Sequence, residues 1–420
     1  MSRSVPRSAF GKWKPRENRD IVGILAAQER TRLPELLPIR HERMRASAFG
    51  FYRGAAAVMA ADLADLTPTG IRVQVCGDAH LQNFGGYASP ERNIVFDVND
   101  FDETLTGPWE WDVLRLATSA EVVARGSSFS RGRTDDVVRA TLSTYRNAMA
   151  HFASVSPLEV WYAHIELPDG SAGTPPRGPE DIKARLLGSA EHEAEQLLPR
   201  VAPAKVPAFV DQPPMFRRIA LDADESLNAR DVIAGYRDSL PPHVRVLLER
   251  FELADLALKV VGVGSVGTRC YAALFRTERG DSLVLQLKEA DASVLEAFAG
   301  PSPYPNHGRR VVEGQHLIQA ASDIFLGWTT SRGIDFYVRQ LHDMKISIAV
   351  AGLGPKALTR YARLCAWTLA HAHARSGSPQ DIAGYIGRSN AFDASAAAFA
   401  RTYAGVTEAD YQRYCATVTS

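Results

Sequence analysis

Three acidic side chains and one amide follow one another in a short stretch of the chain, at Asp78, Asn83, Asp100 and Asp112. Phosphoryl transfer uses groups of these types. One carboxylate accepts or orients the proton of the attacking hydroxyl, while an amide and a second carboxylate hold Mg²⁺ on the nucleotide phosphates. The residue types and their spacing therefore favour a phosphoryl-transfer site.

The elements around these residues would place them at strand ends. Residues 71–75 predict a short strand that ends at Cys76 and Gly77, so Asp78 opens a loop. Residues 93–98 predict the next strand, and Asp100 follows its end. Metal-binding acids commonly lie at strand ends, because the sheet fixes their position while the loop leaves their oxygens free.

A glycine motif of the form G-x-G-x-x-G spans residues 262–267. A dinucleotide-binding unit has this motif between a strand and a helix, whereas a kinase-type lobe has it in a hairpin over the phosphates. The residues that follow predict strands at 268–276 and 282–288 and no helix, which favours the hairpin. A glycine-rich hairpin without a ligand remains open. The hairpin interpretation assigns phosphate binding to Gly262, Gly264, Ser265 and Gly267.

Lys288 ends an apolar predicted strand, where an unpaired ammonium group would be costly to bury. We expect nucleotide phosphates and a helix carboxylate as its partners. Glu313, on the helix predicted at 309–321, is the preferred carboxylate, and Glu296 is the alternative. The strand at 336–341 would then link two lobes, with the backbone of Gln340 and Leu341 meeting an adenine edge.

Composition limits the other classes of function. Of 420 residues, 48 are Lys or Arg and 48 are Asp or Glu, so no overall basic field predicts nucleic-acid binding. The four cysteines are widely spaced, which argues against a zinc site and against a disulfide framework. The N-terminus lacks an apolar signal core, and we find no apolar run that would span a bilayer. We therefore expect a cytoplasmic protein without a membrane partner.

The remaining pattern is mainly helical. Periodicity predicts the region 153–240 to be irregular and helical, with a helical segment near 181–196 and Pro-rich pieces at 198–215. A further strand is expected at 257–261. Thr134 is the expected N-cap of the helix that reaches residue 152. Further helices are predicted at 20–33, 55–66, 108–125, 356–375 and 394–403.

These residues resemble the protein-kinase-like superfamily, especially its aminoglycoside- and choline-phosphotransferase branch. Residues 76–83 (CGDAHLQN) resemble its H-G-D-x-H-x-x-N loop, and residues 100–112 resemble its metal segment. The resemblance implies that Asp78 is the catalytic base, that Asn83 and Asp100 bind Mg²⁺, and that Asp112 braces the loop. Cys76 replaces the leading His of the family motif, and Pro108 falls one position early.

The chain also resembles a large uncharacterised bacterial family, DUF 2252, over most of its length. The segments that carry this resemblance are 51–54, 76–85, 96–112, 311–328, 337–345 and 373–377. Within the first of them, Arg53 could contact phosphate or an acidic substrate, as could Arg43 and Arg45. A surface or ion-pair role is an equal alternative for all three.

The motif order differs from that of kinase-like proteins, in which the glycine loop and Lys precede the catalytic loop. Circular permutation would explain the difference; two unrelated domains are the alternative. We therefore predict an α+β, protein-kinase-like fold with permuted motif order, made of a small antiparallel sheet lobe and a larger, mainly helical lobe. The expected parts are 1–250 (helical lobe with catalytic and metal-binding loops), 251–345 (β lobe with glycine loop and Lys) and 346–420 (C-terminal helices completing the helical lobe).

The leading expectation is an ATP- and Mg²⁺-dependent phosphotransferase that acts on a hydroxyl of a small molecule. The first alternative keeps the nucleotide but transfers AMP, or binds ATP without turnover. More remote alternatives are an NAD(P)-dependent oxidoreductase that uses the glycine motif, and a helical scaffold whose acids are structural.

Overall fold

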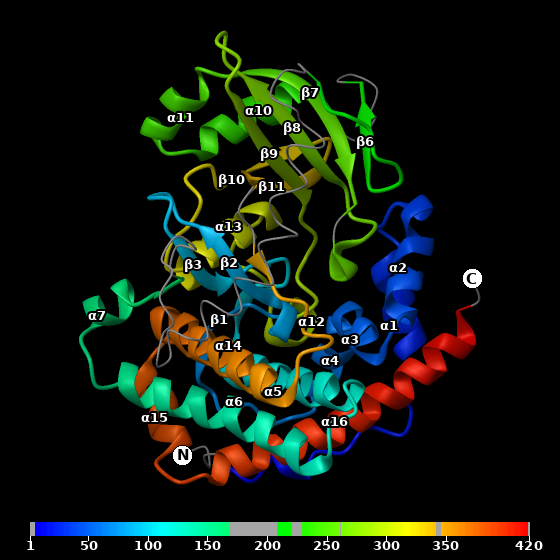
Figure 1. Ribbon diagram of the computed structural model, residues 1–420, viewed down its shortest axis with the longest axis vertical. Coiled ribbons are helices and arrows are strands. Elements are labelled where there is room, and N and C mark those ends of the chain that lie inside the picture. Colours follow the sequence, from blue (N-terminus) through cyan, green and yellow to red (C-terminus); the bar gives the residue numbers. More distant parts are fainter. Residues whose placement is uncertain (1–4, 168–207, 221–228, 261, 342–345, 419–420) are drawn as a thin grey trace.

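The computed structural model describes residues 5–167, 208–220, 229–260, 262–341 and 346–418, so the segments predicted near 181–196 and at 198–207 lie outside the described residues. The fold is α+β. A six-stranded sheet forms the upper part in Figure 1, long helices form the lower part, and two smaller sheets contribute strands between them. All three sheets pair their strands antiparallel.

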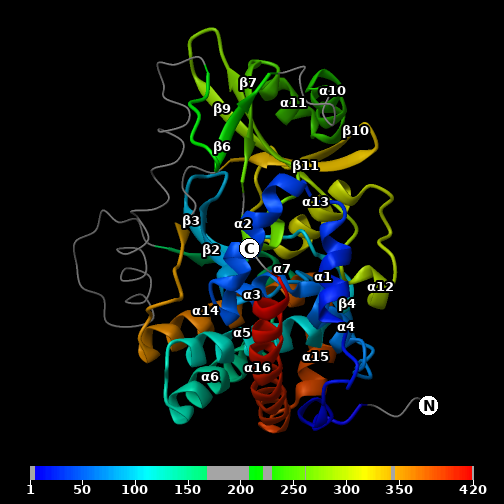
Figure 2. The ribbon, with the colours of Figure 1, turned by 90° about the vertical axis from the view of Figure 1, so that its right-hand side faces the viewer.

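An N-terminal group of short helices packs along one side of the molecule (Figure 2). Asp20 and Ser47 cap two of them by accepting hydrogen bonds from Gly23 N and Gly50 N. The helix predicted at 20–33 is shorter than expected. The elements are η1 (Phe10–Lys12), α1 (Ile21–Glu29), η2 (Pro34–Leu36), α2 (Leu37–Arg45), α3 (Ala48–Gly54) and α4 (Ala56–Leu63).

The N-terminal segment is joined to the C-terminal helix α16 (Ala391–Thr417). Gly11 N donates to Ser395 Oγ at 2.8 Å. Arg19 binds Asp62 of α4 and also Asp410 of α16. The first and the last described elements of the chain are therefore in direct contact.

Two small sheets carry the motif strands predicted at 71–75 and 93–98, which are confirmed within a residue. The first pairs β1 (Arg72–Val75) with β4 (Leu105–Pro108), and the second has the order β12-β2-β3-β5. β2 and β4 were not predicted. The strands of the second sheet are β2 (Phe84–Ala88), β3 (Ile94–Val98), β5 (Ile165–Glu166) and β12 (Ile346–Ser347). The short helix η3 (Leu81–Asn83) precedes β2.

Long helices form the base of the molecule (Figure 1). The expected helix at 108–125 is confirmed as α5 (Trp109–Gly126), and the one at 356–375 is confirmed as α14 (Pro355–Ser376). The Thr134 cap is wrong, because Ser130 is the N-cap and Thr134 is buried inside the helix. The other helices of this base are α6 (Arg131–Phe152), α7 (Pro157–Tyr162), α15 (Pro379–Ile386) and α16. Helix α16 is much longer than the helix predicted at 394–403.

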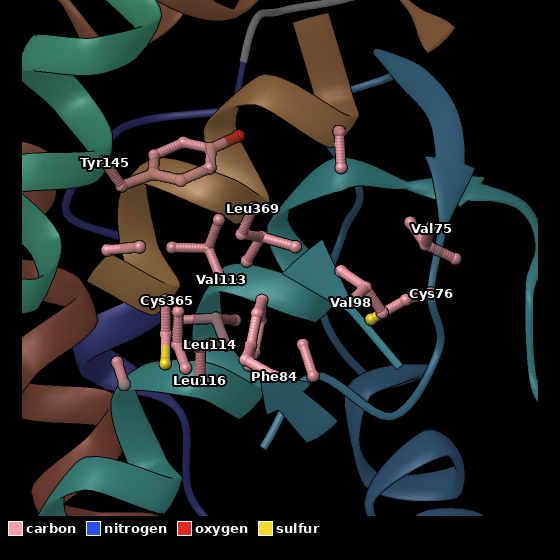
Figure 3. Packing of buried hydrophobic residues seen from close by; sticks show 14 of the residues in the cluster. Val75, Cys76, Phe84, Val98, Val113, Leu114, Leu116, Tyr145, Cys365 and Leu369 are labelled. Atoms are coloured by element: carbon pink, nitrogen blue, oxygen red, sulfur yellow. The ribbon is translucent and has the colours of Figure 1, made fainter. Parts of the chain in front are cut away.

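The main hydrophobic core lies between these helices and the small sheets. Figure 3 shows the buried side chains Val113 and Leu114 of α5 among those of Cys365 and Leu369 of α14, with Phe84 of β2 beside them. Burial of such side chains contributes roughly 1.5–3 kcal/mol each. The core therefore holds the motif loops, which follow β1 and β3, against a rigid helical base.

The six-stranded sheet has the order β10-β11-β9-β8-β7-β6. The predicted strands at 268–276, 282–288 and 336–341 are confirmed within two residues. The strand expected at 257–261 corresponds to β7, which begins and ends earlier than predicted. The strands are β6 (Phe216–Ile219), β7 (Glu252–Lys259), β8 (Cys270–Arg276), β9 (Ser282–Glu289), β10 (Gly327–Ser331) and β11 (Ile334–Gln340), and η4 (Val263–Ser265) lies between β7 and β8.

Helices cover one face of this sheet. Side chains of α10 (Ala229–Ser239) and α11 (Pro242–Leu248) join a second hydrophobic cluster with β7, β8 and β9. β6, α10 and α11 all precede residue 251, so the sheet and its covering helices begin before the predicted boundary. The helix predicted at 309–321 is α13 (His307–Ile318), capped by Asn306, and follows the short α12 (Glu296–Ala299). None of the helices that the structure describes is both long and apolar enough to cross a bilayer.

Candidate active site

A cleft brings together residues from three distant parts of the chain. It encloses about 370 Å³ with its open mouth included. The N-terminal helices form one wall, the loops that follow β1 and β3 form the second, and the glycine motif forms the third. The lining residues are Gln28, Arg53, Gly54, Ala56, Asp78, Asn83, Asp100, Asp102, Glu103, Gly264 and Ser265.

The loop after β1 is held by Asp112 at the start of α5. Its two carboxylate oxygens accept hydrogen bonds from Cys76 N at 2.8 Å and from Gly77 N at 3.0 Å. Gly77 has φ +81°, and a Cβ atom at this position would lie 2.3 Å from Glu103 O. Glycine is therefore required here, both for the backbone conformation and for the close packing. The bracing contact expected of Asp112 is present.

Asp78 is held by a buried arginine that the sequence interpretation did not identify. Arg115 of α5 donates to Asp78 Oδ1 from Nε at 2.6 Å, and its Nη2 lies 2.5 Å from the same oxygen. Burial raises the pKa of Asp78, and the positive charge of Arg115 opposes this change. His80 Nε2 lies 3.6 Å from Asp78 Oδ2. Asp78 thus has a fixed orientation at the edge of the cleft.

The Asn83 amide is oriented by two backbone carbonyls. Its Nδ2 donates to Asp78 O at 3.0 Å and to Asp100 O at 3.1 Å. Its Oδ1 is buried and has no hydrogen-bond partner within the described residues. An unpartnered buried oxygen is costly, so this atom fits a ligand that the protein alone does not supply.

Asn83 and Asp100 are the residues that could offer oxygen atoms to the predicted magnesium ion. Both line the cleft, and the Asp100 side chain is 45% exposed. Mg²⁺ needs only one or two protein oxygens, because phosphates and water complete its octahedron. Among the described residues, no group of three or more His, Cys, Asp or Glu could hold a metal ion. At the predicted site, phosphate oxygens and water would therefore have to supply the other ligands.

Lys288 reaches the metal segment from the sheet. Its ammonium group pairs with Asp102 and lies 3.7 Å from Asp100 Oδ1. Burial by itself would lower the pKa of Lys288. The nearby Asp100, Asp102 and Tyr337 raise the pKa by more than burial lowers it, so the group stays charged. Asp102 also accepts hydrogen bonds from Ser265 Oγ at 2.8 Å and from Tyr337 Oη at 3.0 Å.

The predicted pairing of Lys288 with Glu313 is wrong, because Lys288 pairs with Asp102. Glu313 pairs with Arg309, one turn earlier on α13, and both are partly exposed. Glu296, the alternative, accepts hydrogen bonds from Ser293 N and Ser302 N instead. The rotation of α13 explains the difference, because it directs Arg310 rather than Glu313 toward the Asp102 segment, where Arg310 donates to Asp102 O at 2.8 Å.

The glycine motif lies against the N-terminal helices. Arg40, which is fully buried, donates to Val263 O at 2.8 Å and to Gly54 O at 2.8 Å. Arg32 donates to Gly264 O at 2.8 Å and to Val266 O. The motif contains the single 3₁₀ turn η4 and is followed by β8, not by the α-helix that a dinucleotide-binding unit requires.

Gly262, Gly264, Ser265 and Gly267 are placed unevenly around the cleft. Gly264 and Ser265 line it. A Cβ atom on Gly262 would lie 3.8 Å from Arg53 Nη2, so this residue is near the same wall. Gly267 has φ +95° and packs against Arg32. Its role is therefore in the turn into β8 rather than in the lining.

The backbone N–H groups of Gln340 and Leu341, where an adenine contact is predicted, are already bonded. Gln340 N donates to Asp323 Oδ2, and Leu341 N donates to Val284 O at 2.8 Å. An adenine contact from either N–H would have to replace an existing hydrogen bond. The predicted adenine contact of the Gln340 and Leu341 backbone therefore stays a prediction, and residues 342–345 lie outside the described chain.

A family comparison assigns the chain to a known group. The model of a family described as "Uncharacterized protein conserved in bacteria (DUF2252)" matches residues 32–417. The chain belongs to this DUF2252 family. No curated protein and no solved structure matches the chain.

Within this DUF2252 chain, the sequence interpretation missed the contacts of Arg115 and Asp102. Arg115 follows Asp112 by three residues on α5, so the two share one helix face, and this spacing was a usable signal. The sequence interpretation did not consider Asp102 as the partner of Lys288. A buried lysine needs a nearby acid, and the acid-rich segment after β3 supplied one two residues beyond Asp100.

Proposed function

We propose that this chain is an ATP- and Mg²⁺-dependent phosphotransferase of the protein-kinase-like type, with circularly permuted motif order, that acts on a hydroxyl group of a small molecule. The observation that carries the proposal is the Lys288 contact with Asp102 and Asp100. This contact joins the lysine and glycine loop of one half of the chain to the acidic loops of the other half.

The strand order of the large sheet supports the kinase-like interpretation. Protein kinases have a glycine-rich loop over the phosphates and their lysine on the third strand. Here the glycine motif connects β7 to β8, and Lys288 lies on β9, the third strand of that series. α13 follows before β10 and β11.

The end of α14 supports the permutation. In kinase-like chains, the corresponding helix leads directly into the catalytic strand. Here Gln74 N of β1 donates to Ser376 Oγ at 3.2 Å, and a Cβ atom on Gly377 would lie 2.5 Å from Val73 Cγ1. The end of the helix and the strand are neighbours in space although the chain does not connect them there.

Asp78 is the base in the proposed reaction. It takes the proton of the acceptor hydroxyl while the oxygen–phosphorus bond forms and the bond from the γ-phosphorus to the β-phosphate oxygen breaks, which leaves ADP. Arg115 keeps the carboxylate turned to the cleft, and the Asp112 brace fixes the loop that carries it. Lys288 and the glycine motif would hold the phosphates. Bound Mg²⁺, held by Asn83 and Asp100, would neutralise phosphate charge.

A binding assay followed by a turnover screen tests this proposal. Thermal-shift titration should show stabilisation by Mg·ATP and none by NAD or NADP. A metabolite-library screen should then find an ATP-dependent product that is heavier by one phosphate, whereas a product heavier by AMP would favour nucleotidyl transfer. Lys288→Met should lose the ATP response, and the exposed Lys356→Met serves as the matched control. Stabilisation by NAD(P) alone would overturn the proposal.

A further inference from the structure

The N-terminal helices place an arginine in the cleft beside the proposed catalytic groups. Arg53 lies in the last turn of α3 and lines the cleft with Asp78, Asn83 and Asp100. Its position is fixed at both ends of its helix, because Ser47 caps the start and Arg40 binds Gly54 O after Arg53. The side chain is therefore presented from a rigid element.

Arg53 also lies under the glycine motif. A Cβ atom on Gly262 would lie 3.8 Å from Arg53 Nη2, and one on Gly264 would lie 3.7 Å from Arg53 O. Burial lowers the pKa of the Arg53 guanidinium below its ordinary value, and the nearby negative charges of Asp78 and Asp100 oppose this change only in part. The guanidinium thus lies between the loop proposed to cover the phosphates and the proposed base.

The other cations near the cleft have assigned acceptors. Arg115 binds Asp78, Lys288 pairs with Asp102, and Arg40 binds backbone carbonyls. Arg40 makes its bonds through its two Nη groups, and its Nε has no hydrogen-bond acceptor within the described residues. Arg53 Nε is likewise buried and makes no hydrogen bond within that part of the chain, but its residue, unlike Arg40, lines the cleft. A buried guanidinium N–H without an acceptor is costly, so its retention in a cleft indicates an anionic ligand.

We propose that Arg53 contacts the phosphoryl group during its transfer and supplies in cis a positive charge from the N-terminal helices. This inference rests on the proposed phosphotransferase function. As the acceptor oxygen bonds to the γ-phosphorus and the bond to the ADP oxygen breaks, the proton passes to Asp78 and charge is spread over the three remaining γ-phosphate oxygens. A planar guanidinium can donate two parallel hydrogen bonds to two of these oxygens.

In the proposed role, Arg53 contacts the γ-phosphate and no other part of the nucleotide. A group that contacts only the transferring phosphate should stabilise bound ATP but not bound ADP. It should also act on hydrolysis, in which water replaces the acceptor, because the phosphoryl group is the same. An arginine that recognised an anionic acceptor would leave both ATP affinity and hydrolysis unchanged.

Two variants and one control test the inference in the full-length chain. Arg53→Ala and Arg53→Lys are compared with Arg30→Ala, which removes an exposed arginine at the end of α1. Calorimetry gives the Kd of Mg·ATP and of Mg·ADP, and phosphate release without acceptor gives the rate of hydrolysis. Circular dichroism checks that each variant is folded, and the Lys variant retains the charge if the Ala variant does not fold.

We expect Arg53→Ala to weaken Mg·ATP binding by about tenfold or more while Mg·ADP binding changes less than about twofold. Hydrolysis should fall by roughly 10²–10³-fold, and Arg53→Lys should recover part of it. Equal losses for ATP and ADP, or unchanged hydrolysis, would overturn the role of Arg53 alone. Failure of the wild-type chain to bind Mg·ATP would instead remove the phosphotransferase proposal, and the Arg53 inference with it.

Discussion

Lys288 pairs with Asp102, which lies 186 positions earlier in the chain. The same carboxylate accepts hydrogen bonds from Ser265 of the glycine motif and Tyr337 of β11. One acid therefore joins the sheet, the glycine motif and the segment after β3. Because Lys288 is only 4% exposed at its side chain, this contact also neutralises a charge that would otherwise be buried alone.

Asp102→Ala should destabilise the protein far more than Asp100→Ala. Removing Asp102 leaves Lys288 with only the more distant Asp100, and breaking a buried ion pair costs roughly 3–5 kcal/mol. Asp100 is half-exposed, so its loss should lower the free energy of unfolding by less than about 1 kcal/mol. Urea unfolding of both variants measures the difference. Adding Lys288→Met to Asp102→Ala should recover part of the loss, and equal effects of the two single variants would contradict the assignment.

Asp100→Ala should remove the magnesium-dependent part of ATP binding while the protein without ligands stays folded. The carboxylate is one of two proposed protein ligands, and Mg²⁺ takes few ligands from protein. Thermal-shift titration with ATP, with and without Mg²⁺, measures the effect. The exposed Asp381→Ala is the matched control. Retained Mg²⁺ dependence would show that Asp100 is structural and that another group holds the ion.

Asp78→Asn should separate chemistry from binding. The amide cannot accept the proton, so turnover should fall by roughly 10²–10⁴-fold, while Mg·ATP affinity changes little. Arg115 would lose its charged partner, so the melting temperature should also fall. Turnover is therefore measured well below the melting temperature of the variant, with folding checked by circular dichroism. Turnover near the wild-type rate would place the base elsewhere.

Glu103→Gln should become more stable than the wild type as the pH rises, because the wild type loses stability and the variant does not. Burial raises the pKa of Glu103 to about 7, against the effects of Val294 N–H and Arg310. The folded chain then holds a proton that the unfolded chain releases above its ordinary pKa of 4.5, so wild-type stability falls between about pH 4.5 and 7. Relative to wild type, the variant should gain on the order of 1–3 kcal/mol over this range.

Urea unfolding at pH 5 and pH 8 measures the Glu103 effect. Glu91→Gln, at an exposed position, should give no such dependence. A Glu103→Gln difference that is the same at both pH values would show that Glu103 is ionised in the folded protein throughout this range.

The sequence predicted the positions of the loops better than their partners. Alternating β-formers around the turn at Gly280 specify the β8–β9 hairpin, and the strand ends place Asp78 and Asp100 on loops. β2 was missed because its glycines are poor strand formers, although pairing with β3 holds the strand in place. Local propensity does not contain that pairing.

The wrong partner for Lys288 arose because the periodicity of the sequence does not fix how α13 is rotated about its axis. Gly314 packs against Thr104, where a Cβ atom would lie 2.4 Å from its Cγ2, so this face of the helix turns inward with Arg310. Glu313 consequently faces outward beside Arg309. Tertiary packing of a glycine, rather than the charge pattern along the helix, decides which side chain meets the acidic segment.

The contact of Arg19 with Asp410 has a consequence for synthesis on the ribosome. Arg19 and the N-terminal helices are synthesised long before α16, yet Arg19 binds Asp410 of α16. Leu33 N donates to Gly267 O of a loop that is made in between. Contacts between such distant segments close large loops and slow folding. A nascent chain without α16 therefore lacks the support that holds the wall carrying Arg53. The cleft wall can therefore be completed only after α16 has been synthesised and has packed against this segment.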